Sequence, residues 1–340
     1  MRKLIGLLGV GVIALMLAGC KSTPPAQDED SSSQGVHIYV ADTENDRIVR
    51  IDDMAGHHWT EFGAWGLQTD HFAGPNCIFV DAQGHIYVGD TGSTEKGSIS
   101  RIVRMDDMRG KNWVEFGQPG GGVGQFKDVS DIWVDDKTGR IFVADNKAHR
   151  IVCMDDMTGK GWVTYGREAD PEGGRGSFFG PEGVSLDSRG RIYIADKSRI
   201  IRIDDMTGAH WTEYAPKDPI HGLSGACKVV LDSHDRLFIA DRNNNRIVKV
   251  DGMDGSYWKA CDTFIVEGDK AMFQKPHGLA LDQQGRIYVT DGVGVDSTGD
   301  VLKMSRIVSL DNLSSGQAMS LGSSGKGDNE FDFPNSIYVR

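Results

Sequence analysis

The chain has 340 residues, of which 39% are hydrophobic and 25% are charged, and this composition is typical of a globular protein rather than a disordered one. Its formal net charge of −12 leaves no basic stripe to neutralise phosphates, so the sequence argues against nucleic-acid binding. The same charge disfavours simple electrostatic adhesion to anionic lipid.

The first twenty residues, MRKLIGLLGVGVIALMLAGC, predict a secretory signal peptide. Two basic residues precede an apolar run from Leu4 to Leu17, which is too short to indicate a membrane span. The last four residues, LAGC, resemble the lipobox of bacterial lipoproteins. This resemblance implies that Cys20 is lipidated and becomes the first residue of the mature chain. With Lys21 rather than Asp after it, the resemblance also implies an outer-membrane anchor. An ordinary cleaved signal peptide is the alternative.

Residues 21–35 read KSTPPAQDEDSSSQG and contain no large apolar side chain. This composition predicts a flexible tether between the lipid and a folded domain at 36–340. The expected location is therefore the cell envelope, with the domain periplasmic or exposed on the surface. Four further cysteines form no C-x-x-C motif, and an oxidising compartment permits a disulfide whose pairing the sequence does not assign. These cysteines are Cys77, Cys153, Cys227 and Cys261.

One unit is repeated six times after the tether. Segments such as HIYVAD (37–42), RIFVAD (140–145) and RIYVTD (286–291) end in an Asp, and these Asp residues lie 48, 55, 51, 45 and 50 residues apart. Each segment is followed by a second one of the type RIVRID, and five units then carry a tryptophan. Another short apolar segment precedes each unit, such as CIFVD (77–81). Four strands per unit at a period near fifty residues predict a six-bladed β-propeller, an all-β fold.

The two ends of the chain predict how the ring closes. The chain enters at a second strand, VHIYVAD, and leaves on a first strand, FPNSIYVR, so the C-terminal strand is expected to complete the first blade. The RIV segments and the F-x-x-P-x-G pattern resemble NHL-repeat propellers over essentially all of 36–340. The Asp and Arg that flank each hairpin, such as Asp42 and Arg47, are interpreted as structural pairs, and the repeated tryptophans as packing between blades.

The residue at the start of each innermost strand is predicted to face the central channel. Because the six strands begin at the same end of the ring, six polar or ligating side chains are expected to converge there as a binding site. In ring order they are Asn335, Asn76, Ser130, Glu182, Cys227 and His277.

Two resemblances give these residues a possible metal chemistry. Peptidyl-hydroxyglycine amidating lyases are propellers of this class whose zinc is held by histidines in P-H-G contexts on three blades. PHGLALD, with His277, matches one such position, but the other positions lack histidine. Gluconolactonase-type propellers hold a calcium-like ion with Glu, Asn and Asp. Glu182, Asn76 and Asn335 are therefore the candidate ligands of one divalent ion, with His277 as a candidate general base.

Two loops depart from the repeat, at residues 89–101 and 290–306. Both are predicted on the face of the channel mouth, because a second strand ends where a first strand begins, and irregular loops commonly carry binding specificity. Their candidate binding residues are Thr94, Glu95, Lys96, Asp296 and Asp300.

Three functions remain open from the sequence. The first is a lipid-anchored, monomeric scaffold that binds another envelope or exported protein, or a polymer. The second is a metal-assisted hydrolase or lyase with its site at the channel mouth. The third is an architectural protein without a ligand.

Overall fold

The computed structural model describes residues 35–94, 97–169, 173–292, 305–314 and 316–340. The predicted signal peptide, its Cys20 and the predicted tether up to Gln34 lie outside the described residues. Residues 35–340 form one compact unit. No helix in the described part of the chain is long and apolar enough to cross a membrane. Four of the predicted loop residues also lie outside the described ranges, namely Glu95, Lys96, Asp296 and Asp300.

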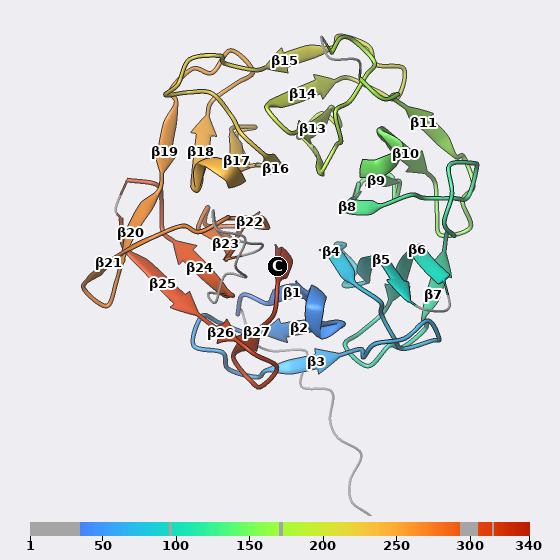
Figure 1. Cartoon of the computed structure of the whole chain (residues 1–340), viewed down its shortest axis with the longest axis horizontal. Helices are drawn as coiled ribbons and strands as arrows, with labels where there is room; N and C mark the ends of the chain where they lie inside the picture. The colour runs from blue at the N-terminus through green and yellow to red at the C-terminus, as the bar shows by residue number, and fades with distance from the viewer. Residues whose placement is uncertain (1–34, 95–96, 170–172, 293–304, 315) are drawn as a thin grey trace, which may run out of the picture. The chain divides into compact units, whose positions relative to one another are not determined.

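Six four-stranded antiparallel sheets stand as blades around a central axis in the described unit (Figure 1). The innermost strands are β28 (Pro334–Val339), β4 (Pro75–Val80), β8 (Val129–Val134), β12 (Gly183–Leu186), β16 (Ala226–Leu231) and β22 (Leu279–Leu281). The second strands are β1 (Ile38–Asp42), β5 (Ile86–Thr94), β9 (Ile141–Asp145), β13 (Ile192–Asp196), β17 (Leu237–Asp241) and β23 (Ile287–Asp291). The third strands are β2 (Arg47–Ile51), β6 (Gly97–Met105), β10 (Arg150–Met154), β14 (Arg199–Ile203), β18 (Arg246–Val250) and β24 (Arg306–Leu310). The outermost strands are β3 (Thr60–Phe62), β7 (Val114–Phe116), β11 (Val163–Tyr165), β15 (Thr212–Tyr214), β19 (Lys259–Cys261) and β25 (Ala318–Leu321).

Short elements complete the blades. Three 3₁₀ turns, η1 (Thr43–Asn45), η2 (Asn146–Ala148) and η3 (Arg242–Asn244), join second to third strands. Two small ribbons lie in the connections on either side of blade 6. They are formed by β20 (Thr263–Val266), β21 (Asp269–Met272), β26 (Ser323–Ser324) and β27 (Glu330–Phe331).

The burial of each strand explains its composition. The second strands β1, β9, β13, β17 and β23 are buried at every residue, because neighbouring blades cover both faces. A strand buried on both faces needs a continuous apolar run of β-branched and aromatic residues, as in the IYVAD and IFVAD segments. The outermost strand β3 is only partly buried, and its TEF sequence carries polar side chains.

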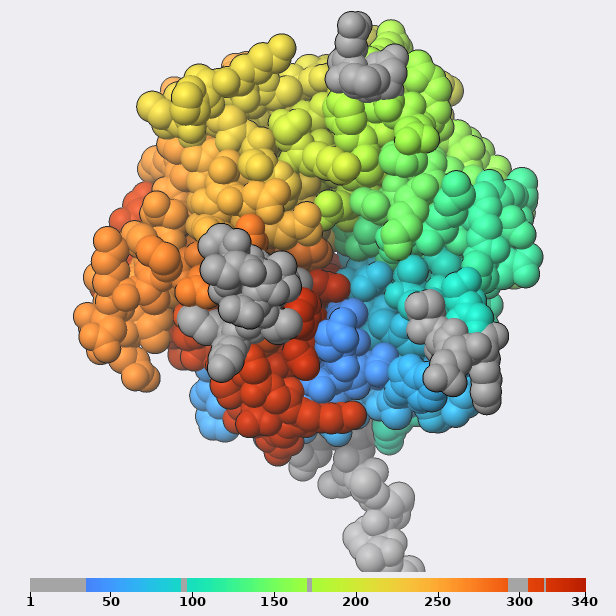
Figure 2. All heavy atoms as spheres, in the orientation of Figure 1, coloured from blue at the N-terminus to red at the C-terminus, as the bar shows by residue number. Residues whose placement is uncertain are grey.

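The ring closes as the sequence predicts. β28 pairs antiparallel with β1, with Ile337 opposite Val40 and Val339 opposite Ile38. Each innermost strand also contacts the next one around the axis, and β22 contacts β28 to complete the circuit. Figure 2 shows the C-terminal segment, in red, against the N-terminal segment of the ring, in blue. The six-bladed propeller and its C-terminal closing strand are therefore confirmed.

The repeated Asp and Arg residues are structural pairs in all six blades. In each blade the repeated Arg of the third strand contacts the repeated, buried Asp of the second strand, at 2.7 to 3.1 Å. In five blades the same guanidinium lies 5.5 to 5.8 Å from the centre of the repeated tryptophan ring. Phe116 of blade 2 packs against Trp162 of blade 3, with ring centroids 6.1 Å apart. Both predicted structural roles are confirmed.

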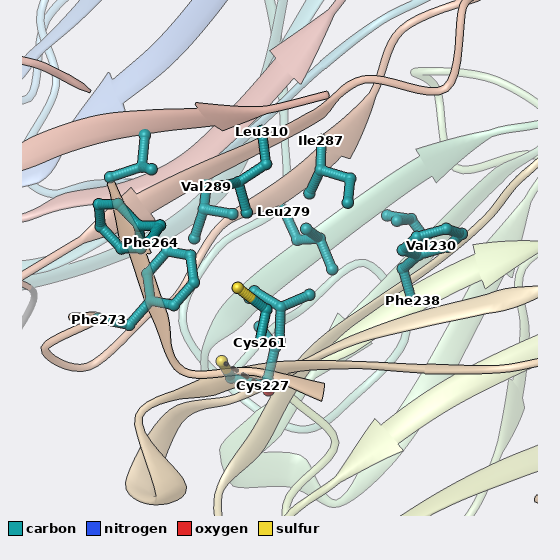
Figure 3. Close-up of a cluster of buried hydrophobic side chains, with 13 residues drawn as sticks. Cys227, Val230, Phe238, Cys261, Phe264, Phe273, Leu279, Ile287, Val289 and Leu310 are labelled. Atoms are coloured by element: carbon teal, nitrogen blue, oxygen red, sulfur yellow. Dashed lines mark hydrogen bonds between the residues drawn. The ribbon is translucent and has the colours of Figure 1, made fainter. Parts of the chain in front are cut away.

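The four cysteines of the propeller are buried and free. Cys227 lies on the innermost strand of blade 5 and Cys261 on its outermost strand, within an apolar cluster between blades 5 and 6 (Figure 3). Neighbouring strands are about 4.8 Å apart, so three intervals separate these two strands by about 14 Å, beyond the reach of a disulfide.

Candidate functional site at the channel mouth

Four of the six predicted residues share a backbone irregularity. Asn76, Ser130, Cys227 and Asn335 are each the extra residue where the register between first and second strand shifts. A β-bulge of this kind bends the strand and redirects one side chain. The same position of the repeat is bulged in four blades, and three of these bulged residues line the cavity at the channel mouth.

Glu182 and His277 reach the same place from unbulged blades. The Glu182 N–H donates to the Ala195 carbonyl at 2.9 Å, directly before β12. The His277 N–H donates to the Thr290 carbonyl at 2.9 Å, two residues before β22 begins.

Five of the six predicted residues line one polar cavity of about 190 Å³. Cys227 is buried, and its thiol lies 3.5 Å from the His277 carbonyl and 3.6 Å from the Pro276 carbonyl. Two further lining residues were missed by the sequence analysis because they lie outside the aligned strands: Asp128 directly precedes β8, and Asn146 begins the turn η2. The lining residues are Asn76, Asp128, Ser130, Asn146, Glu182, His277 and Asn335.

An ion pair occupies one wall of this cavity. Both Arg242 Nη atoms donate to the Glu182 carboxylate, at 2.9 and 3.2 Å, and only 17% of the Glu182 side chain is exposed. Burial raises the pKa of Glu182, and the guanidinium opposes that shift. Arg242 begins η3 of blade 5 and was not predicted as a site residue. The carboxylate is therefore largely committed to a partner within the protein.

His277 is a neutral hydrogen-bond acceptor. Its Nδ1 lies 2.7 Å from the Asn335 carbonyl, which can only accept, so the ring proton is on Nδ1 and Nε2 carries a lone pair. Burial lowers the pKa of His277 to about 3, and the nearby charge of Arg242 acts in the same direction. A base with this pKa takes up protons weakly at neutral pH, which disfavours the predicted role as general base.

A groove leads from the cavity toward the rim of the ring. In blade 2 the hairpin of β5 and β6 continues to Thr94 and Gly97, whereas the other fully described hairpins end at the Asp–Arg pair. The groove of about 500 Å³ lies beside this hairpin and shares Asn76 and Asp128 with the mouth cavity. Of the predicted loop residues, only Thr94 is described, at the end of β5.

The outer edge of the long hairpin has no neighbouring strand. β7 pairs with β6 only from Ile102 to Arg104, so within the described residues no strand lies beside Ser98–Ser100 on this side. Ser98, Ile99 and Ser100 line the groove on this side, and Pro119 and Gly120 line it opposite. An unpaired edge presents backbone N–H and C=O groups that another extended segment can pair with.

Comparison with known proteins now identifies the repeat. Residues 273–295 match the family model of the NHL repeat. The matched segment includes the strands β22 and β23 of blade 6. The predicted resemblance to NHL-type propellers is thus confirmed.

Solved structures with a similar fold extend over nearly the whole chain. A chain of the nidogen–laminin complex aligns with a TM-score of 0.65 at 16% identity, covering 90% of this chain and 98% of that one. A protein of unknown function from Bacteroides caccae aligns with a TM-score of 0.60 at 13% identity, with the same coverage. A second one, from Bacteroides thetaiotaomicron VPI-5482, aligns with a TM-score of 0.57 at 15% identity, covering 90% of this chain and 71% of that one. At these identities the likeness concerns the fold alone. No curated protein matches the sequence.

The donor set at the channel mouth fits a divalent ion poorly. The predicted ligands Asn76 and Asn335 bond each other, with Nδ2 of Asn335 donating to Oδ1 of Asn76 at 3.3 Å. Among the described residues, the group with ligand geometry is instead Glu182, Cys227 and His277, whose ligand atoms lie within 4.8 Å of one another. Glu182 is held by Arg242, and burial raises the pKa of the Cys227 thiol to about 12. A cation would have to displace a guanidinium and ionise this thiol.

Proposed function

We propose that this protein is a lipid-anchored, extracytoplasmic binding protein that holds an extended segment of another envelope or exported protein. The partner lies in the groove beside the long hairpin of blade 2. The observation that carries the proposal is the unpaired edge of β6, next to a groove that opens into the channel mouth.

Strand addition is the binding mode that this edge supports. A partner segment beside Ser98–Ser100 gains main-chain hydrogen bonds, and its side chains enter the groove between β6 and Pro119. The mouth cavity of about 190 Å³ then accepts one polar side chain. Acceptors dominate that cavity, since His277 Nε2 is unprotonated, so a side chain with N–H donors fits best.

The position of the tether favours this face for binding. His37 N and O pair with Arg340 O and N, at 2.8 and 2.9 Å, at the end of the ring opposite the channel mouth. Gly35, where the described ring begins, therefore lies on the far side from the groove.

The enzymatic alternative lacks comparable support. The cavity holds a neutral imidazole of low basicity and a carboxylate that is already paired. Metal analysis of purified protein and of the Glu182→Ala and His277→Ala variants tests this point. We expect less than one metal per chain, with no dependence on either residue. Stoichiometric metal in the wild type that both variants lose would instead support the function of a metal-assisted hydrolase or lyase.

Affinity capture from the native envelope tests the binding function. In the test variant, residues 91–100 are replaced by the Asn-Lys-Ala-His turn of blade 3, because Asp90 and Arg101 pair as Asp145 and Arg150 do. The control variant carries the same turn in blade 1, in place of residues 43–46. We expect one partner to co-purify with the wild type and the control but not with the test variant. Retention of that partner by the test variant contradicts the proposal.

A further inference from the structure

The other end of the channel contains a second, separate cavity. A chamber of about 600 Å³ opens among the turns that follow the innermost strands, and it narrows to a throat of about 100 Å³. Leu231, Leu281, Tyr338 and Val339 line both spaces, so the chamber and the throat are continuous. Neither space shares a lining residue with the channel-mouth cavity. The size of the chamber is in the range of small-molecule sites.

A buried ion pair closes the inner end of the throat. Lys228 Nζ of blade 5 donates to both carboxylate oxygens of Asp131 in blade 3, at 2.6 and 2.7 Å. The Val184 N–H of the blade between them also donates to Asp131, at 2.8 Å. Side-chain exposure is 12% for Lys228 and 3% for Asp131. The pair separates the two ends of the channel and leaves the throat without net charge.

The walls of the throat are aromatic. Phe79 contacts Tyr338 and Trp133, with ring centroids 4.6 and 5.2 Å apart. Leu279 and Ile337 complete the apolar lining. Such a surface favours a flat ring, which gains both apolar burial and stacking energy.

Three hydrogen-bond donors of the throat have no acceptor among the described residues. The Tyr338 hydroxyl and the Trp133 indole N–H form no hydrogen bond within that part of the chain, and two of the three Lys228 donors are used by Asp131. Burial raises the pKa of Tyr338, so its hydroxyl stays protonated and able to donate. A ligand must therefore bring acceptor atoms.

The carboxylates at the rim of the chamber are already engaged. Asp232 accepts from the N–H groups of His234 and Arg236 and from the Arg236 guanidinium, at 2.6 to 3.0 Å. Asp282 is held in the same way by backbone N–H groups and by Tyr288. These acids stabilise turns, so the specificity of the site comes from the throat.

We infer that the lower end of the channel binds a small, uncharged aromatic molecule that carries a carbonyl or a comparable acceptor oxygen. The ring lies against Phe79, Trp133 and Tyr338, and the oxygen accepts hydrogen bonds from Tyr338 and Lys228. A charged acid is disfavoured, because Asp131 already neutralises Lys228 and the acid would lose its hydration in the throat. This site is independent of the partner-binding face.

Fluorine NMR of protein labelled with 5-fluorotryptophan tests the inference, with benzamide as the probe. The Trp133 resonance is assigned by its loss in Trp133→Phe. We expect benzamide to shift this resonance saturably and to leave that of Trp211, which directly precedes the outermost strand β15, unchanged. Benzoate should bind at least tenfold more weakly. Absence of a saturable Trp133 shift overturns the site, and equal binding of benzoate overturns its preference for uncharged ligands.

A matched pair of variants separates specific binding from general apolar affinity. Tyr338→Phe removes the free hydroxyl and keeps the ring, so benzamide should bind at least fivefold more weakly. Tyr193→Phe removes a hydroxyl from β13 of blade 4, away from the throat, and should leave binding unchanged. Melting temperatures of both variants confirm that they fold. Equal affinity of the two variants for benzamide contradicts the proposed donor role of Tyr338.

Discussion

The two ends of the channel use the same repeat to different effect. At the mouth, three bulged residues line a polar cavity, namely Asn76, Ser130 and Asn335. The His277 imidazole and the asparagine amides of this cavity can form further hydrogen bonds. At the lower end, the turn carboxylates bond their own backbone, and the free donors lie deeper, in an aromatic throat. The Lys228–Asp131 pair divides the two. In a repeat protein, the groups available for binding are thus those polar side chains that the hydrogen bonds within each repeat do not use.

Breaking the dividing pair should have the largest effect. Lys228→Met leaves the Asp131 carboxylate buried without its partner, and the free energy of unfolding should fall by about 3–5 kcal/mol. Urea denaturation measures this. The Asp131→Leu/Lys228→Met double variant should recover most of the loss, because no unpaired charge remains. Wild-type stability of Lys228→Met alone would show that the pair does not form.

Removing Arg242 should affect only the mouth. Glu182 then remains largely buried without its guanidinium, and stability should fall by about 1–3 kcal/mol. Glu182→Gln in the same background should restore part of the loss. Benzamide binding at the lower end should be the same as in the wild type. A shifted Trp133 signal in Arg242→Met would contradict the separation of the two ends.

Acidification should destabilise the protein through His277. The folded pKa is about 3 and the unfolded one is near 6.5, so between these values only the unfolded chain binds the proton. The contribution of neutral His277 to the free energy of unfolding is complete above pH 6.5. It is lost as the pH falls, by up to about 2 kcal/mol between pH 6.5 and 5. Carboxylates also titrate in this range. The measurement is therefore the difference in the free energy of unfolding between wild type and His277→Asn at each pH. Parallel pH profiles of the two proteins would refute the buried, neutral imidazole.

The smallest effect concerns the attachment of the long hairpin. Thr91 Oγ1 accepts the Val129 N–H of blade 3 at 3.0 Å. Thr91→Val removes this acceptor and should cost about 1 kcal/mol in chemical denaturation. Thr60→Val in the outer strand β3, where the hydroxyl bonds only a local carbonyl, is the control and should change stability less. Equal costs for both would indicate that the hairpin does not depend on this bond.

The sequence predicted the architecture because closure and blade number follow from repetition, and it also predicted which first-strand residues gather at the mouth. It did not show why they gather. One bulged residue such as Asn76 does not visibly change the alternation of apolar and polar residues along its strand, so the bulge could not be predicted. Arg242 was missed because it lies within a turn interpreted as structural. The lower cavity was missed entirely, because its throat is lined by apolar residues such as Phe79 and Leu279 that look like ordinary core residues in the sequence. Whether such residues line a cavity depends on how the six innermost strands pack around the axis.

The most direct test of the partner-binding claim is site-specific photocross-linking in cells, with p-benzoylphenylalanine in place of Ser98 on the edge of β6. The control carries it in place of Val163, an exposed position on the outermost strand of blade 3. The account predicts one discrete adduct from position 98, with a protein that the control does not capture. Absence of an adduct at position 98, or the same adduct from both positions, would contradict binding along this edge.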